Sequence, residues 1–322
     1  MDDYIKDENC IFYAYAQNGY PFKINFEVLA IADIYRCNIY FTKMGIYIFE
    51  YDGNNDIVDE NFSITKLIFD IKFNRCNFND YFCKEEKILN VDVKDVKKMM
   101  KHIKKKDSIK IVLIKPNLNG EKIKNFQIYI SPENSNMNSR TEKKNIQCND
   151  VEDKTQQNTI SDEVYHFPKQ IQSMDSTKVK SLLLDSKEYI RIIIQTDKYI
   201  SFNNVTNLDE YMDIKNQSAT FFGRIRSNEI LEFPPYFPSN YKYINNYDEI
   251  FKTSHIDILT KLNGLSKYIL FYAPIDNELY PLKVQILNGN LGIFTMYIKT
   301  HHQIEIEKNL LKINDGDIKL CS

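Results

Sequence analysis

The chain has 322 residues, 43% of them hydrophobic and 13% aromatic, and its 42 lysines and arginines nearly balance its 44 aspartates and glutamates. This length favours two domains over one, each with a substantial core. No apolar run approaches the ~20 residues of a membrane span, and the N-terminus lacks the order of a signal peptide, so we expect an intracellular protein without a membrane partner. The cysteines form no CxxC pair and are expected to be reduced thiols.

The first half of the chain predicts strands around two helices. A helix is expected from Pro21 to Asp33, because proline is favoured at a helix start. The strands and apolar stretches expected around it are 11–17, 36–42, 45–51, 62–73, 78–83, 108–115 and 125–130.

The second predicted helix of this half lies in the segment VDVKDVKKMMKHIKKKD, residues 91–107. At 100° per residue, the apolar side chains fall in one arc of roughly 120°; they are Val93, Val96, Met99, Met100 and Ile103. A separate arc carries Lys94, Lys97, Lys98, Lys101, Lys104 and Lys105. Asp92 is the expected N-cap. The lysines are either a solvated helix face or a surface that meets a polyanion such as the DNA backbone, and both interpretations remain open at this point.

Residues 131–162 are polar and are interpreted as a flexible insert. After it we expect a helix at 176–186 and another at 255–264, with Ser254 as N-cap and Gly264 at its end. The strands expected in this half are 164–170, 189–196, 199–204, 267–274, 279–287 and 292–300, with an irregular stretch at 205–250. The order of helix and strands at 92–130 thus recurs roughly 160 residues later, which indicates two similar halves.

Three stretches in this order resemble the DNA sliding clamps, the proliferating-cell-nuclear-antigen superfamily. CNIYFTKMGIYIFEYD is similar to the early hairpin of that family, KILNVDVKDVKKMMKHIKKKDSIKIVLI to its strand–helix–strand passage, and NELYPLKVQILNGNLGIFTMYI to its closing hairpin. CNIYFTKMGIYIFE and FFGRIRSNEILEFP are also similar to the Rad-one type subunit of the heterotrimeric DNA-damage checkpoint clamp.

The resemblance implies an α+β fold of two similar sliding-clamp domains, each with two helices packed on antiparallel β-sheets, forming part of a ring. The implied units are domain 1 at 10–131, a flexible connector at 132–162, domain 2 at 163–302 and a C-terminal tail at 303–322. The implied partners are double-stranded DNA, other clamp subunits and a clamp-loader ATPase, and the implied location is the nucleus. No cofactor and no enzymatic activity are expected.

The resemblance also assigns sites. Lys178 and Lys180 on the third helix join the lysines of residues 94–105 as expected DNA contacts. Matching to the family's peptide-docking site points to Tyr51, Pro281 and Phe294, although Phe294 could equally be core and Tyr51 a turn residue. Edges for subunit contacts are expected on the strands that contain Ile128 and Ile192.

Candidate catalytic groups have simpler interpretations. His102 is interpreted as structural or DNA-facing, and His301–His302 as an exposed strand end without ligands at metal spacing. Asp52 and Asp56 lack the rest of a calcium loop and are interpreted as turn residues. Two alternatives to a checkpoint clamp remain: a homotrimeric replicative processivity factor, and a β-rich interaction protein that does not bind DNA.

Overall fold

The computed structural model is a mixed α+β fold, and the strand pairs among its described residues are antiparallel. The structure describes residues 9–52, 64–116, 122–132, 141–151, 160–165, 173–184, 188–195, 199–205, 223–224, 247–276 and 279–320. The elements of the first half are β1 (Cys10–Ala16), α1 (Tyr20–Ile31), β2 (Arg36–Phe41), β3 (Gly45–Tyr51), β4 (Leu67–Asn74), β5 (Asp80–Cys83), β6 (Lys87–Asp92), α2 (Val93–Met100), β7 (Ser108–Ile114), β8 (Asn125–Ser131) and β9 (Glu142–Val151). Those of the second half are η3 (Asp162–Val164), β10 (Ser173–Asp175), α3 (Ser176–Leu184), β11 (Tyr189–Gln195), β12 (Tyr199–Val205), β13 (Gly223–Arg224), β14 (Tyr247–Lys252), α5 (Thr253–Ile256), α6 (Leu259–Leu262), β15 (Tyr268–Tyr272), β16 (Leu282–Leu287), β17 (Gly292–Ile298) and α7 (His301–Leu320).

The described strands form two sheets in which one order occurs twice. The larger sheet has the order β10-β15-β16-β17-β4-β3-β2-β6-β9-β8-β7-β1-β5, and the smaller has the order β13-β12-β11-β14. The run β1-β7-β8-β9 therefore corresponds to β10-β15-β16-β17, and β6-β2-β3-β4 corresponds to β14-β11-β12-β13. Helices also follow the corresponding strands, because α1 and α3 come after β1 and β10, and α2 and α5 come after β6 and β14. The repeat expected from the sequence is thus visible in the strand order.

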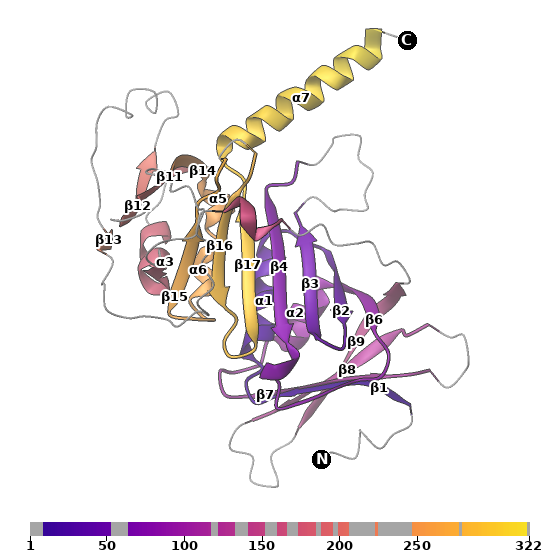
Figure 1. The fold of residues 1–322 in the computed structure, drawn as a ribbon. Coiled ribbons are helices and arrows are strands. Elements are labelled where there is room, and N and C mark those ends of the chain that lie inside the picture. Colours follow the sequence, from indigo (N-terminus) through magenta and orange to yellow (C-terminus); the bar gives the residue numbers. More distant parts are fainter. Residues whose placement is uncertain are drawn as a thin grey trace.

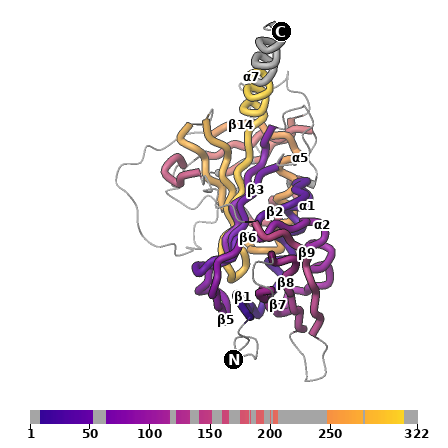
Figure 2. Tube along the Cα trace, turned by 90° about the vertical axis from the view of Figure 1, so that its right-hand side faces the viewer, coloured from indigo at the N-terminus to yellow at the C-terminus, as the bar shows by residue number. Residues whose placement is uncertain are grey.

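Helices α1, α2, α3 and α6 form a layer on one side of the large sheet. α1 packs against α2, α3 packs against α6, and α1 also contacts α6 across the two halves. Figure 1 shows α1, α2 and α6 behind the strands, and Figure 2 shows α1 and α2 on one side of β2, β3 and β6. The apolar side chains of α1 that are buried in this layer include Phe22, Phe26 and Leu29. One face of the sheet is therefore covered by helices, and the helices turn their other side to solvent.

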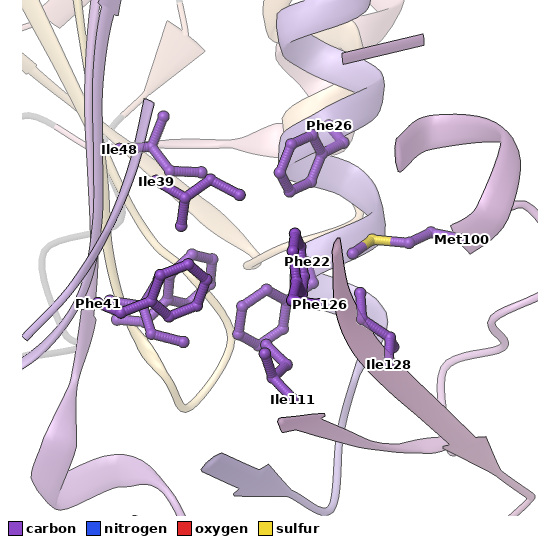
Figure 3. A pocket seen from close by; sticks show the side chains of 11 residues that line it. Phe22, Phe26, Ile39, Phe41, Ile48, Met100, Ile111, Phe126 and Ile128 are labelled. Carbon is purple, nitrogen blue, oxygen red and sulfur yellow. The ribbon is translucent and has the colours of Figure 1, made fainter. Parts of the chain in front are cut away.

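The core of the first half fills the space between α1, α2 and the strands. Figure 3 shows Phe22 and Phe26 of α1 and Met100 of α2 facing Phe41 and Ile128 of the strands. Only an apolar void of about 10 Å³ remains among these side chains. A void of this size holds at most one water and its apolar lining offers that water no partner, so it is a packing gap and not a ligand site.

The two halves meet where β17 pairs with β4. Phe294 lies opposite Ile71 in this register, and its ring packs edge-on against Phe69 with centroids 6.1 Å apart. Behind the sheet, Asn25 of α1 donates a 2.8 Å hydrogen bond to the side chain of Asn288 in the β16–β17 turn. Both asparagines are fully buried, so this polar pair fixes the turn against α1.

The structure differs from several of the expected elements. Where a strand was expected at 164–170, Val164 ends the short helix η3 and Tyr165 makes an isolated bridge, and residues 166–170 lie outside the described residues. Residues 142–151 are not part of a flexible connector but form β9, whose Ile146 and Cys148 are buried. The helix expected at 255–264 is two short helices, and its N-cap is Lys252 in place of Ser254. His301 and His302 begin the helix α7, which covers most of the expected tail at 303–322, and are not a strand end.

Candidate nucleic-acid interface

The lysine-rich segment forms a short amphipathic helix, α2, with the expected cap. Asp92 accepts a 3.0 Å hydrogen bond from the backbone N–H of Asp95, as an N-cap does. Val93, Val96 and Met100 are buried against α1 and the neighbouring strands. The apolar arc expected from the sequence is thus confirmed for α2.

The helix ends earlier than expected, at Met100, and residues 101–107 form turns. Asp107 shapes these turns, because its carboxylate accepts a 2.8 Å hydrogen bond from the N–H of Lys104. The Nζ of Lys23 on α1 donates to the carbonyls of Lys101 and Ile103, at 2.9 and 3.1 Å. Lys23 therefore satisfies backbone acceptors in the turns that follow α2. Its ammonium is engaged in this contact, so Lys23 positions the segment and is not a further free charge.

The predicted lysines all lie on the solvent side of this segment. Exposed side chains belong to Lys94, Lys97, Lys98, Lys101, Lys104, Lys105 and Lys106. Lys101, Lys104, Lys105 and Lys106 follow the end of α2 and do not lie on the helix. Across the described part of the chain, the lysines at 94, 97, 98, 101, 104 and 105 form no ion pair. A dense set of ammonium groups without acidic partners attracts polyanions.

Two tyrosines restrain part of this lysine surface. The Nζ of Lys94 lies 4.7 Å from the ring centroid of Tyr35, and the Nζ of Lys105 lies 5.9 Å from that of Tyr20. A cation over an aromatic face is attracted by the ring quadrupole and keeps its charge at the surface.

Removing the cap of α2 should weaken the platform that carries the lysines. We expect Asp92→Ala to lower the free energy of unfolding by ~1 kcal/mol, because an N–H of the first turn loses its acceptor. Asp92→Asn should restore most of this stability, since asparagine also caps helices. Urea unfolding of the three proteins measures the difference, and equal midpoints for the alanine and asparagine variants would show that the cap contributes nothing.

The other helices of the layer carry fewer cations. Lys178 and Lys180 are exposed on α3, as expected, and Lys261 is exposed on α6 near the exposed Asp257. The positive surface is therefore concentrated on α2 and the turns that follow it.

The groups set aside as catalytic candidates have structural roles or lie at the surface. Asp52 accepts hydrogen bonds from the N–H groups of Lys66 and Leu67, at 2.6 and 2.7 Å, which makes it a loop-closing residue; Asp56 lies outside the described residues. His102 is exposed in the turn after α2. The ring of His301 packs edge-on against Tyr189, with centroids 5.3 Å apart.

The residues assigned to peptide docking do not form a common exposed surface. Phe294 is fully buried in the core, and Pro281 is also buried. Tyr51, at the end of β3, is 39% exposed. The assignment of Phe294 to an accessible pocket is therefore wrong, and its alternative interpretation as a core residue is confirmed.

The strands assigned to the subunit edges are not edges. β8, with Ile128, pairs with β7 on one side and β9 on the other. β11, with Ile192, pairs with β12 and β14. Both isoleucines are buried, at 1% and 0% exposure, so neither can contact another subunit.

No protein-family model matches the sequence, and no curated protein matches it either. Among the described helices, none combines the length and the apolar character needed to cross a membrane.

Proposed function

We propose that the chain is one subunit of a ring-shaped DNA sliding clamp, of the DNA-damage checkpoint type, that encircles duplex DNA and tethers repair or signalling partners. The observation that carries this proposal is the exposed lysine surface of α2 and its turns, on the open side of a helix layer. The opposite side of that layer is a continuous antiparallel sheet. This arrangement suits the wall of a ring in which the sheet lies outside and the positive helix layer faces inward.

The repeated strand order supports two similar clamp domains in this proposal. β4 of the first half pairs with β17 of the second, so one sheet runs through both halves without a break. A continuous outer sheet suits a subunit that forms an arc of a ring. The boundaries at 10–131 and 163–302 need one revision, because β9 extends the first domain to Val151.

Lysine side chains suit a protein that moves along DNA. An ammonium group is a strongly hydrated point charge that contacts phosphates without reading bases. Such contacts are exchangeable, and a closed ring prevents escape even when each contact is weak. The sequence has no phosphate-binding loop of the GxxxxGK[ST] type, so a separate ATPase would load the ring.

Subunit contacts in this proposal use the open edge of β9 in place of the edges first expected. β9 pairs with β8 over residues 142–147 and with β6 over residues 148–151. In the described part of the chain, the edge of residues 142–147 that faces away from β8 has no strand partner. An unpaired edge offers backbone donors and acceptors to a strand of a neighbouring subunit.

The uneven distribution of lysines favours unlike subunits over a homotrimer. In a homotrimer, every subunit must contribute the same positive charge to the lining of the central hole, whereas unlike subunits can contribute different amounts. We expect the purified chain to be a monomer by native mass spectrometry, and to enter a trimer only when it is co-expressed with different clamp-like chains. A stable homotrimer of the isolated chain would favour the replicative processivity factor.

A further inference from the structure

A short segment, Ser161–Tyr165, lies against the face of the sheet that the helices leave open. Leu282 and Val284 of β16 point into the core, so the alternating Lys283 points to the other face. The same alternation places Tyr297 of β17 on that face, directly opposite Lys283 in the strand register. Tyr272 of β15 is the partner of Lys283 on its other side. These three side chains form a row across three regular strands.

Tyr165 is held by this row almost as a bound ligand would be. Its side chain is buried, with 2% exposure, and its ring centroid lies 6.0 Å from that of Tyr297. Its hydroxyl donates a 3.0 Å hydrogen bond to the carbonyl of Pro281. Burial raises the pKa of both Tyr165 and Tyr297, so the Tyr165 hydroxyl remains a donor. The backbone of Val164 accepts a 2.8 Å hydrogen bond from the N–H of Ile275.

Lys283 supplies the charged part of the contact. Its side chain is only 7% exposed, and its Nζ lies 2.5 Å from a carboxylate oxygen of Asp162, which is itself 76% exposed. The ammonium also lies 4.8 Å from the ring centroid of Tyr272 and 5.5 Å from that of Tyr165. A buried ammonium needs a counter-charge, and the structure supplies it from the segment and not from the sheet.

The two sides of this contact are built differently. Lys283, Tyr272 and Tyr297 belong to strands with ladder partners on both sides, which hold the receiving surface in place. The segment Ser161–Tyr165 contains only the single turn η3 and one isolated bridge, between Tyr165 and Pro274. The receiving surface can therefore keep its shape when the segment leaves.

We propose that Ser161–Tyr165 is an intramolecular ligand that closes this surface, and that a partner segment with a carboxylate three residues before a tyrosine replaces it. The surface selects tyrosine over phenylalanine, because only a hydroxyl can donate to the Pro281 carbonyl. It selects a carboxylate over an amide, because only a negative charge balances Lys283. This inference goes beyond the proposed function and does not depend on DNA binding.

The direct test opens the site in the full-length chain and offers the segment as a separate peptide. The probe is a fluorescent, C-terminally amidated peptide with the sequence of residues 160–165, Ile-Ser-Asp-Glu-Val-Tyr. We expect it to bind the Tyr165→Ala variant at least tenfold more tightly than the unmodified protein, measured by fluorescence anisotropy. Adding Lys283→Met to that variant should abolish the gain, and peptides with asparagine for the aspartate or phenylalanine for the tyrosine should bind more weakly.

Hydrogen exchange separates a displaceable segment from a purely structural one. In Tyr165→Ala we expect faster exchange at residues 160–165 and at the amide of Ile275, with unchanged protection of β16 and β17. Glu163→Gln is the matched control, because Glu163 is an exposed neighbour in the same turn and its change should leave all these sites protected. The proposal is overturned if Tyr165→Ala loses protection throughout β15, β16 and β17, or if the well-folded variant binds the peptide no better than the unmodified protein.

Discussion

Replacing Gly292 by alanine is expected to lower the melting temperature by at least about 5 °C. A Cβ at this position would lie 1.9 Å from the carbonyl oxygen of Lys72, on the strand that joins the two halves. Backbone atoms cannot yield as a side-chain end does, so β17 would have to move away from β4. The overpacking and the lost ladder hydrogen bonds together should cost about 2–4 kcal/mol.

Gly264→Ala is the matched control for this effect, because Gly264 also lies between the halves. The nearest atom to a Cβ there is Cδ1 of Ile24, at 3.2 Å, and this end of a side chain can adjust. Thermal unfolding of both variants should therefore show a large shift for Gly292 and a small one for Gly264. Equal shifts would mean that the β4–β17 junction is not the sensitive point.

The sequence predicted most strands because their apolar residues alternate or run continuously. β9 was missed because Glu142–Val151 buries only Ile146 and Cys148 and, apart from the partly exposed Val151, is otherwise polar. A strand that relies on backbone pairing with β8 and β6, and buries little, resembles a loop in composition. No local pattern separates the two cases.

The lysine surface was predictable because an amphipathic helix encodes its own faces. The turns that follow α2 were not predictable, because their carbonyls bind Lys23, which is 78 residues away from Lys101 along the chain. The contact is made only when α1 packs against α2, so a local periodicity cannot reveal it.

The assignments of the docking residues and of the edge strands were wrong for a related reason. Alternation in β17 shows that Phe294 and Tyr297 lie on opposite faces, but not which face the helices cover. The apolar strands with Ile128 and Ile192 read as candidate edges, yet apolar character on both faces is typical of a strand in the middle of a sheet. Whether a strand lies at the edge of a sheet depends on its pairing partners, and the whole fold determines which strands pair.

Reversing the charge of the lysine surface is expected to remove DNA retention without unfolding the protein. The test variant changes Lys94, Lys98, Lys101 and Lys105 to glutamate, and all four side chains are exposed. Each phosphate contact contributes roughly 0.9 to the slope of log K on log salt, so four lost contacts should reduce the slope by about 3–4. Affinity for duplex DNA at low salt should fall on the order of 100-fold.

The matched control reverses the same number of lysines on other surfaces, at Lys43, Lys72, Lys84 and Lys115. These lie in the β2–β3 turn, on the face of β4 opposite the helices, and after β5 and β7. Because both variants replace four lysines by glutamate, their net charge changes equally. If the protein encircles DNA with its helix layer inward, the control should keep most of its salt-dependent retention by duplex DNA, with the relevant partner chains and loader present. Equal losses in both variants would indicate that net charge alone governs binding. Full retention in the helix variant, with its melting temperature unchanged, would mean that the lysines are a solvated face and would favour the interaction protein that does not bind DNA.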